Sequence, residues 1–414
     1  MRSVCLPLFV WLALQLAAQP ADTTFLAQLM RQQGDDFHEL LSHPEKYELQ
    51  IIYTQIDQRG TQKVFTPYHF RVDPHRYFYP ASTVKMPAAF LALEKLNQLH
   101  ISDLTKHSAM IHGMGHPPQT AARQDTTSPD GLPSIAQYIR KIFLVSDNEA
   151  YNRLYEFLGQ EYINQQLIKK GYANSRIIHR LGAQGAPFGP EENQSTNPVS
   201  FYNGDGLVYH QGEVNSQAPQ QLELRGEQKG KGFFRNGKLV EQPFDFQHKN
   251  FVALNDLNEM LKSVLFPESV PSEQRFQLTE EDYQFLYRCM GMRPRESKSP
   301  TYDKADSYVK FFLFGAQEED MPEHIRIYNK VGWAYGYLTD VAYIVDSKND
   351  VEFMLAASIH VNDNQIFNDN NYQYETIGMP FFARLGEAIY QHELQRSKNE
   401  QTDLSRFEFF GSAH

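Results

Sequence analysis

The sequence predicts an α/β protein in which one sheet is built from both ends of the chain and a helical domain is inserted between them. Strand-like runs lie near both ends, whereas segments with helical periodicity occupy the middle. Two lobes arranged in this way leave a cleft between them, and such a cleft is a natural place for an active site.

The composition is that of a globular protein. Of the 414 residues, 41% are hydrophobic and 21% are charged, which excludes wholesale disorder, a collagen and a multispanning membrane protein. The net charge is −11 and no basic stripe accompanies it, so we expect no binding to nucleic acid. The length allows two or three domains, or one large core with insertions.

The N-terminus predicts export. Arg2 precedes a short apolar run that closes on the small residues Ala17 and Ala18, so residues 1–19 are expected to be a signal peptide. A membrane anchor or a buried helix is the alternative for this run. Cleavage would leave Cys289 as the only cysteine, which allows no internal disulfide. We expect secretion across the inner membrane, most simply into a bacterial periplasm, as a monomer with no membrane span.

The first elements follow from periodicity. A helix is expected over 25–41, where the apolar residues fall on one face, and strands over 47–53 and 64–72. The further helices expected are one that opens near Ser82, two within 135–157 that are separated by residues 145–148, and others over 254–265 and 280–290.

The C-terminal part changes character. Strands are expected over 325–332, 337–345 and 351–361, followed by a helix over 379–392. The run 351–361 is almost continuously apolar, which is typical of a central strand that is covered on both faces. We therefore assign 20–81 and 296–398 to the sheet domain, 82–295 to the helical domain and 399–414 to a C-terminal tail.

Residues 204–250 stand apart as an inserted β-hairpin. Asn236-Gly237 lies between short apolar runs, a pattern that favours a type I′ turn. The segment carries a local excess of basic residues, namely Arg225, Lys229, Lys231, Arg235 and Lys238. Two interpretations stay open, a solvated hairpin and a surface for polyanionic envelope material.

Three short motifs carry the residues that we expect to do chemistry. They are Ser82-Thr-Val-Lys85 at a predicted helix start, Ser146-Asp147-Asn148 between two predicted helices, and Lys330-Val331-Gly332 on the first of the C-terminal strands. Positions three apart on a helix share a face, so the Lys85 ammonium can reach the Ser82 hydroxyl. A serine hydroxyl needs such a neighbouring base before it becomes a useful nucleophile.

The three motifs, in this order, resemble the S-x-x-K, S-D-N and K-T-G motifs of the class A serine β-lactamases and the related penicillin-binding peptidases. The resemblance runs from about residue 47 to residue 390, apart from the hairpin and a stretch near 296–323. It implies a two-lobed fold of the β-lactamase type, in which a helical domain is set into an α/β domain that ends in antiparallel strands.

The resemblance also implies a role for each motif residue. Ser82 would be the nucleophile and Lys85 its base, provided that burial or a second cation, Lys330, lowers the lysine pKa. Ser146 would pass the proton to the leaving nitrogen. The substrate-binding residues would be Asn148, Gly332 and Trp333, and the backbone N–H groups of Ser82 and Trp333 would form the oxyanion hole.

The sequence departs from the family at two positions that bind the carboxylate of a substrate. Val331 replaces the threonine of K-T-G, and Leu338 stands where many class A enzymes carry an arginine. Trp333 is bulky where relatives carry a small residue, so it is expected to wall off part of the cleft. Affinity for an anionic β-lactam is therefore in question.

A third departure concerns the water that releases the acyl group. With Arg180 opening the loop and residues 196–198 closing it, Gly182 falls at the position of the family's loop glutamate. Glu191 and Glu192 lie later in this loop, either as a replacement base or as surface residues that pair with Arg180.

Three histidines, His107, His112 and His116, lie within ten residues of one another. Their spacing matches no known zinc pattern, so loop histidines are preferred over a metal site. We expect neither a metal ion nor an organic cofactor.

The sequence therefore predicts an exported serine hydrolase that acts on β-lactam amides through an acyl-Ser82 intermediate, as an antibiotic-resistance enzyme does. One alternative is a D-alanyl-D-alanine peptidase or an esterase that deacylates slowly, acting on a peptidoglycan-derived acyl donor. A second alternative is a module that binds β-lactams or envelope material without turnover.

Overall fold

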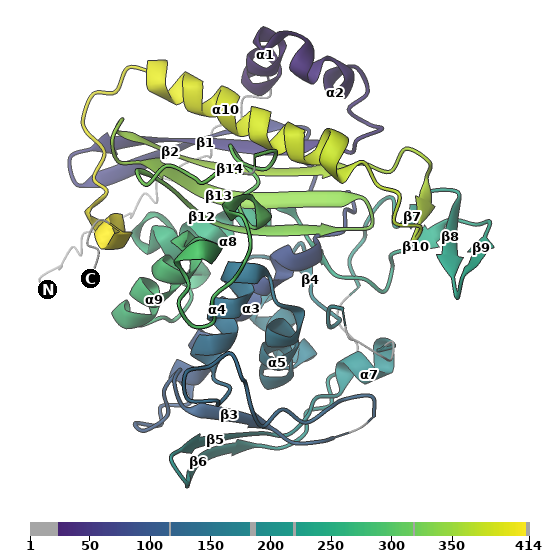
Figure 1. Ribbon diagram of the computed structural model, residues 1–414, viewed down its shortest axis with the longest axis vertical. Helices are drawn as coiled ribbons and strands as arrows, with labels where there is room; N and C mark the ends of the chain where they lie inside the picture. Colours follow the sequence, from purple (N-terminus) through teal and green to yellow (C-terminus); the bar gives the residue numbers. More distant parts are fainter. Residues whose placement is uncertain (1–23, 116, 183–187, 218–220, 318, 411–414) are drawn as a thin grey trace, which may run out of the picture.

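A computed structural model describes residues 24–115, 117–182, 188–217, 221–317 and 319–410. The predicted signal peptide, 1–19, lies outside these residues. The centre of the fold is a five-stranded antiparallel sheet with the strand order β12-β13-β14-β1-β2 (Figure 1). Its strands are β1 (Gln50–Arg59), β2 (Gln62–Phe70), β12 (Ile325–Ala334), β13 (Tyr337–Asp346) and β14 (Val351–His360). The prediction of one sheet built from both chain ends is confirmed.

Helices cover both faces of this sheet (Figure 1). On one face lie α1 (Phe25–Gln32), α2 (His38–Ser42) and α10 (Met379–Gln395), and on the other lie α8 (Leu254–Leu265) and α9 (Glu280–Gly291). Two hydrophobic cores result, one on each face. All residues of β14 except the last are buried, as expected for a strand between two cores.

The helical lobe lies beyond α8 and α9. It contains α3 (Lys85–Gln98), α4 (Ile135–Val145), α5 (Asn148–Leu158), α6 (Gln160–Lys169) and the short α7 (Pro190–Gln194). The predicted interruption at residues 145–148 is present, because α4 ends at Val145 and α5 begins at Asn148. Pro87 lies in the first turn of α3, where the backbone N–H that proline lacks is not required as an intrahelical donor.

The single helix predicted over 25–41 is wrong. The segment instead forms α1, a 3₁₀ turn at Gly34–Phe37 and α2. Gly34 has φ +70°, a left-handed conformation that ends a right-handed helix and that glycine adopts without steric cost.

A sheet at the far end of the helical lobe was not predicted. It consists of β3 (Ala109–His112), β5 (Val199–Asn203) and β6 (Gly206–Gln211) (Figure 1). Residues 206–211 therefore belong to this sheet and not to the hairpin expected over 204–250. The strands are short and only half-buried, so their alternation of apolar and polar residues is weak.

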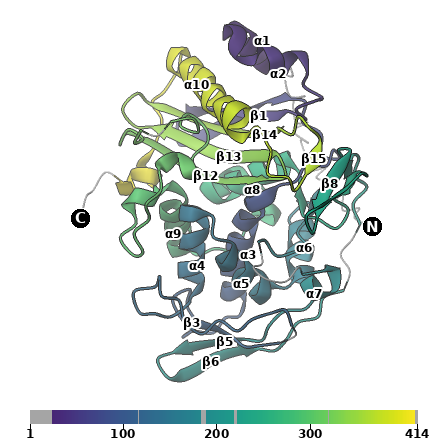
Figure 2. The same ribbon diagram turned by 45° about the vertical axis from the view of Figure 1, so that its right-hand side comes forward.

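The hairpin itself is shorter than expected. Its strands are β8 (Gly232–Arg235) and β9 (Lys238–Val240), and Asn236 and Gly237 have φ values of +51° and +74°. Positive φ at both positions is what a type I′ turn requires, so the Asn-Gly prediction is confirmed. β8 also pairs with β15 (Ile366–Phe367), which holds the hairpin against the sheet domain (Figure 2).

The remaining strands are short pairs: β4 (Ser175–Arg176) with β11 (Phe251–Val252), and β7 (Gln228–Lys229) with β10 (Phe244–Asp245). Two of the basic residues of the insert are engaged within the molecule. The Lys229 ammonium lies 2.6 Å from the Glu48 carboxylate, and Arg225 lies 2.6 Å from Asp73. This pairing reduces the charge that the insert can offer to a polyanion.

None of the helices in the described part of the chain combines the length and apolar character needed to cross a bilayer. Cys289 is a buried free thiol on α9, and burial raises its pKa to about 12.

Candidate active site

Ser82 lies in a tight turn immediately before α3. The 3₁₀ turn Ala81–Val84 leads directly into the helix, and Thr83 fixes it, because both its backbone N–H and its hydroxyl donate to the Pro80 carbonyl. Ala81 has φ +46°, a strained conformation for a residue with a side chain. The turn leaves Ser82 half-buried at the edge of a cavity.

Two lysine ammonium groups converge on the hydroxyl of Ser146. Lys330 Nζ donates to Ser146 Oγ at 2.9 Å, and Lys85 Nζ lies 3.2 Å from the same oxygen. Lys85 also donates to the Ser146 carbonyl and, at 2.7 Å, to Asn148 Oδ1. The three motifs, far apart in the sequence, thus meet through direct hydrogen bonds.

Both lysines have lowered pKa values. Burial lowers the pKa of Lys85 well below its usual range, and the nearby charge of Lys330 lowers it further. Burial lowers the pKa of Lys330 to about 7. A buried pair of ammonium groups in contact with one hydroxyl favours a state in which one lysine is neutral. A neutral Lys85 is able to accept a proton.

The turn between α4 and α5 serves two purposes. Ser146 has φ +55° and ends α4, which directs its carbonyl and hydroxyl toward the lysines. Asp147 caps α5 by accepting a hydrogen bond of 2.7 Å from the Ala150 N–H. Asp147 therefore has the structural role of a helix cap, whereas the side chains of Ser146 and Asn148 contact the Lys85 ammonium.

At Gly332, β12 packs closely against the turn that contains Ser82. A Cβ atom on Gly332 would lie 2.5 Å from the Pro80 carbonyl oxygen and 2.8 Å from the Ser82 nitrogen. Only glycine permits this approach. The contact places the next residue, Trp333, at the cavity, where its side chain is 41% exposed and its ring lies 5.3 Å from that of Tyr374.

A buried polar network supports β12 from behind, and sequence reasoning missed it. The Lys310 ammonium donates to Asn329 Oδ1 at 2.7 Å, and the Asn329 amide donates to Asp340 at 2.8 Å. Burial raises the pKa of Asp340 to about 6, and the charge of this carboxylate counteracts the fall in the Lys330 pKa. The signal in the sequence was the presence of Asn329 and Asp340 among the mostly apolar residues of two predicted strands.

The two departures at the carboxylate-binding positions are buried away from the cavity. Val331 is 2% exposed and Leu338 is fully buried, and both belong to the core between the sheet and α10. Side chains alternate along a strand, so Val331 lies on the opposite face of β12 from Lys330. Neither position presents a hydrogen-bond donor to a substrate.

The loop that begins at Arg180 is fixed at its base. Arg180 donates to the carbonyls of Glu192 and Ser195, and its ion pair is with Glu156 at 3.4 Å. The suggested pairing of Arg180 with the Glu191 or Glu192 carboxylate is therefore wrong.

Gly182 lies against Asn148. It has φ +50°, and a Cβ atom there would lie 2.2 Å from the Asn148 amide nitrogen. The expected position of the loop glutamate is thus filled by the Asn148 side chain. Glu191 is exposed and Glu192 is half-buried in α7, and neither lines the Ser82 cavity formed by the described residues.

The Ser82 cavity has a volume of about 560 Å³. The residues that line it are Tyr79, Ala81, Ser82, Asn148, Leu181, Gly182, Trp333, Ala334, Tyr335, Asn368, Asn370, Tyr372 and Tyr374. The last four come from a segment rich in asparagine and tyrosine between β14 and α10, and sequence reasoning did not select them. Their composition was the available signal, because asparagine and tyrosine recur there without helical or strand periodicity.

The histidines do not form a cluster that the structure describes. His112 is fully buried on β3, and its Nε2 lies 3.1 Å from the Arg153 carbonyl. His116 lies outside the described residues. Among the described residues, no group of three potential ligands is placed to hold a metal ion.

One comparison with known proteins matched a family model. Residues 23–222 match the model of the β-lactamase enzyme family, a range that includes Ser82, Lys85 and Ser146. This match confirms the resemblance that the motifs predicted, and the fold is of the β-lactamase type. No curated protein matches the chain.

Solved structures that the comparison matched to this chain include a β-lactamase from Sphaerobacter thermophilus DSM 20745, which is 14% identical, with 90% of this chain and 97% of that chain covered and a TM-score of 0.47. A structure described as PBP-A is 14% identical, with 90% and 98% covered and a TM-score of 0.49. A class A β-lactamase from Clostridium kluyveri DSM 555 is 13% identical, with 89% and 97% covered and a TM-score of 0.43.

Proposed function

We propose that this chain, which is similar to the β-lactamase enzyme family over residues 23–222, is a serine hydrolase that forms an acyl-enzyme on Ser82 and releases the acyl group slowly. Its acyl donors would be β-lactams or peptidoglycan-derived amides and esters. The observation that carries the proposal is the double hydrogen bond of Lys85 and Lys330 to Ser146 beside the Ser82 turn.

The acylation step that we propose uses these groups in sequence. Ser82 Oγ attacks the carbonyl carbon of the donor, and its proton passes to the neutral amine of Lys85. When the carbon–nitrogen bond of the amide breaks, the proton moves from Lys85 through the Ser146 hydroxyl to the departing nitrogen. Lys330 keeps one positive charge at the junction, which favours the neutral form of Lys85 and stabilises negative charge on the donor.

None of the described residues that line the Ser82 cavity is a carboxylate that could serve as the base for the release step. Hydrolysis of an acyl-serine requires a group that takes a proton from water, and the family places a glutamate in the loop for this purpose. Here Gly182 occupies that position and Asn148 fills the space beside it. This contact favours the alternative of a slowly deacylating, penicillin-binding type of protein over the predicted fast β-lactamase.

Intact-protein mass spectrometry after mixing with benzylpenicillin tests the proposal. We expect an adduct with the mass of the whole penicillin that forms on the wild-type chain, persists for many minutes and is absent from a Ser82→Ala variant. An adduct that disappears within seconds as hydrolysed penicillin accumulates would instead establish a β-lactamase. If no adduct forms with benzylpenicillin or with a thioester of an N-acylated D-alanine, the proposal fails.

We also propose that residues 1–19 direct export and are removed. The support is the apolar run after Arg2. Mass measurement of the protein recovered from the periplasmic fraction of an expressing bacterium would show a chain that begins near residue 20. A full-length chain retained in the cytoplasm would contradict export.

A further inference from the structure

The hairpin of β8 and β9 is fixed on one of its faces. Phe233 on that face is 3% exposed, and its ring lies 5.2 Å from the ring of Phe244. β8 is also held between two strands, because it pairs with β15 on one side and with β9 on the other. Figure 1 shows the hairpin at the periphery of the molecule, beside β7 and β10. The hairpin is therefore mounted rigidly at an exposed position.

The opposite face of this three-stranded sheet carries an apolar patch. Phe234 and Leu239 lie directly opposite each other in the register, and they are 36% and 47% exposed. Ile366 of β15 adjoins them, because a Cβ atom on Gly232 would lie 3.0 Å from Ile366 Cδ1 and 3.2 Å from Leu239 Cδ1. Contiguous exposed apolar side chains, unlike single ones, indicate a surface that contacts another apolar medium.

The same hairpin carries positive charge that is not balanced within it. Residues 231–240 include Lys231, Arg235 and Lys238 and no acidic residue. All three basic residues are exposed, and none of them forms an ion pair with another residue in the described part of the chain. Arg235 lies over the ring of Phe233 at 5.1 Å.

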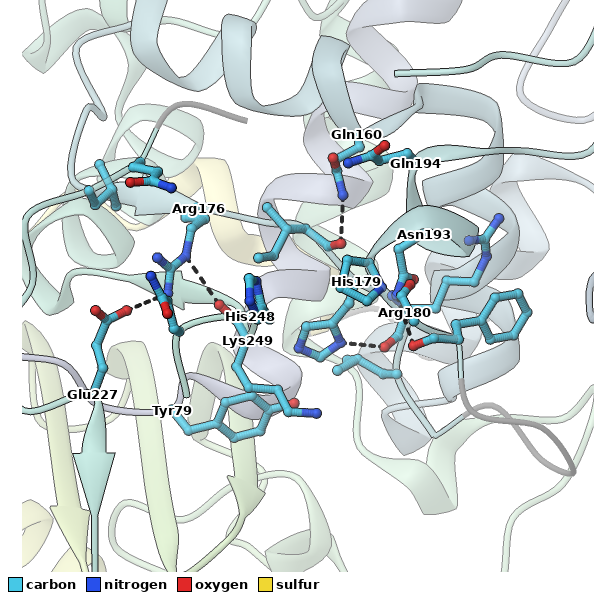
Figure 3. Close-up of a pocket in the computed structure, with 18 of the residues that line it drawn as sticks. Tyr79, Gln160, Arg176, His179, Arg180, Asn193, Gln194, Glu227, His248 and Lys249 are labelled. Carbon is cyan, nitrogen blue, oxygen red and sulfur yellow. Dashed lines mark hydrogen bonds and ion pairs between the residues drawn. The ribbon is translucent and has the colours of Figure 1, made fainter. Parts of the chain in front are cut away.

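The basic residues around the base of the insert are engaged within the molecule instead. Arg176 is paired with Glu227 at 2.9 Å, and Lys229 is paired with Glu48. Lys249 lies in a cavity of about 470 Å³ that the insert helps to line (Figure 3). The exposed positive charge of the insert is therefore concentrated on the hairpin.

We propose that the hairpin face, formed by Phe234, Leu239, Ile366 and the three basic side chains, docks on the surface of a membrane that contains anionic lipids. Basic side chains are attracted to such a surface, and aromatic and aliphatic side chains enter the boundary between headgroups and acyl chains. A soluble polyanion would bind the charges but leave the apolar patch in water, so the combination favours a lipid surface. This inference does not depend on the proposed function.

The charges of the hairpin can reach the lipid headgroups. Arg235 and Lys238 lie opposite each other at the turn, and long basic side chains extend to headgroups while apolar neighbours are inserted. The acidic residues at the border of the hairpin are Glu241 and Asp369, and Asp369 accepts a hydrogen bond of 2.7 Å from the Asn364 amide. The chain has a net charge of −11, but charges farther than about 8 Å away are largely screened at physiological ionic strength.

Docking would bring the membrane close to the Ser82 cavity. Asn368 lines both this cavity and the groove beside the hairpin turn, and its amide donates to the Phe234 carbonyl at 3.3 Å. A docked chain therefore holds the cavity near the lipid surface.

Vesicle sedimentation tests the contribution of charge. The probe is a vesicle of equal parts phosphatidylglycerol and phosphatidylcholine, and vesicles of phosphatidylcholine alone are the uncharged comparison. We expect the wild-type chain to bind the anionic vesicles more tightly, and this binding to weaken as salt is added. Replacing Lys231, Arg235 and Lys238 by glutamine should weaken it about a hundredfold, since each basic residue near an anionic surface contributes roughly fivefold.

The matched control replaces three exposed lysines of other elements by glutamine, namely Lys169, Lys298 and Lys348. It changes the net charge by the same amount and should bind the anionic vesicles nearly as the wild type does. An equal loss in the control would show that net charge, and not the hairpin, decides binding, which would overturn the inference. The apolar run near the N-terminus is common to all these chains and contributes equally to each.

The apolar patch is tested by combining Phe234→Ser with Leu239→Ser. We expect binding to the anionic vesicles to weaken on the order of tenfold, because less apolar surface enters the lipid, while binding to polyphosphate stays unchanged. The control combines Ile168→Ser with Leu207→Ser, two residues that are 41% and 58% exposed elsewhere, and should behave as the wild type in both assays.

Two results would overturn docking on lipid. One is the absence of binding to anionic vesicles at low salt. The other is vesicle binding that the two serine substitutions in the hairpin leave unchanged, which would identify the hairpin as a surface for soluble polyanions. Acylation of Ser82 by benzylpenicillin, measured without vesicles, should be the same in all these variants, so a failure of the proposed function is observed separately.

Discussion

The two sides of the Ser82 cavity are built in opposite ways. On one side, α3, the α4–α5 turn and β12 bring two lysines onto the hydroxyl of Ser146. On the other side, the loop after Arg180 contributes Gly182, which has no side chain and lies against Asn148. The first side holds titratable groups with displaced pKa values, whereas the second presents no carboxylate to the cavity among the described residues.

This difference separates the forming of an acyl-enzyme from its release. Acylation needs a base and a cation held at fixed distances, and regular elements packed on a core supply that rigidity. Release needs one further base, and loops vary without disturbing the core. A chain of this fold can therefore keep the first function while the second changes, and the predictions below test each side separately.

The largest effect on the acylation rate is expected on the side of the cavity that holds Lys85 and Lys330. In a Lys85→Met variant the Ser82 hydroxyl loses its base, so the rate of acylation by benzylpenicillin should fall about a thousandfold. The rate is measured as adduct formation by intact-protein mass spectrometry. Lys95→Met is the matched control, because it removes another lysine of α3 whose ammonium donates to carbonyls away from Ser82. A fall of equal size in the control would mean that the helix, and not the base, was damaged.

The pH dependence of acylation should show two limbs. Lys85 must be neutral, so the rate falls as the pH drops through the lowered pKa of Lys85, where this group takes up a proton. Lys330 must be charged, and its pKa is about 7, so the rate also falls as the pH rises above about 7 and this group loses its proton. The measurement is the acylation rate between pH 5 and pH 10.

A Lys330→Arg variant sharpens this prediction. Arginine stays charged throughout this range, so the alkaline limb should disappear while the acid limb remains. We expect the maximal rate to fall about tenfold, since the guanidinium matches the position of the ammonium only in part. If the alkaline limb persisted in the variant, another group than Lys330 would be responsible for it.

The same contrast explains what the sequence could predict. Ser82, Lys85, Ser146 and Lys330 could be selected as candidates because their spacing and order are local patterns, and the fold brings Lys85, Ser146 and Lys330 into contact. The network of Lys310, Asn329 and Asp340 was not predicted, because no local pattern in the sequence indicates which polar side chains meet across a sheet.

The side of the cavity formed by the loop after Arg180 was predictable only in part. The absence of a glutamate at Gly182 was visible in the sequence, but the contact of Gly182 with Asn148 was not, because it depends on a left-handed backbone and on packing between segments. The sheet made of β3, β5 and β6 was missed for a related reason, since short half-buried strands carry little periodicity.

The loop side can be probed by attempting to restore the missing base. A Gly182→Glu variant should not gain turnover, because its Cβ would collide with the Asn148 amide and its backbone would be held at a positive φ. The left-handed conformation should cost about 1–2 kcal/mol of stability. Displacing Asn148, which accepts a hydrogen bond from Lys85, should slow acylation about tenfold.

Gly182→Ala is the matched control, since it introduces the same Cβ without a carboxylate. Equal acylation and release rates in the two variants are expected in the mass-spectrometric time course. Faster release in Gly182→Glu alone would show that the loop has room for a base. The difference between the two sides of the cavity would then depend only on the residue at position 182.

The smallest effect is expected at Trp333, which lines the Ser82 cavity. Its indole ring is 41% exposed and packs on Tyr374 at 5.3 Å, so Trp333→Ala widens the cavity and removes an aromatic contact worth about 1 kcal/mol. Acylation by a penicillin with a dimethoxyphenyl arm should accelerate about threefold, because a change of cavity shape alters the rate only by about 1 kcal/mol or less, whereas benzylpenicillin should react as before. Phe234→Ala, an exposed aromatic residue outside this cavity, is the control. An equal change for both penicillins would mean that Trp333 acts on the backbone of β12 and not on the width of the cavity.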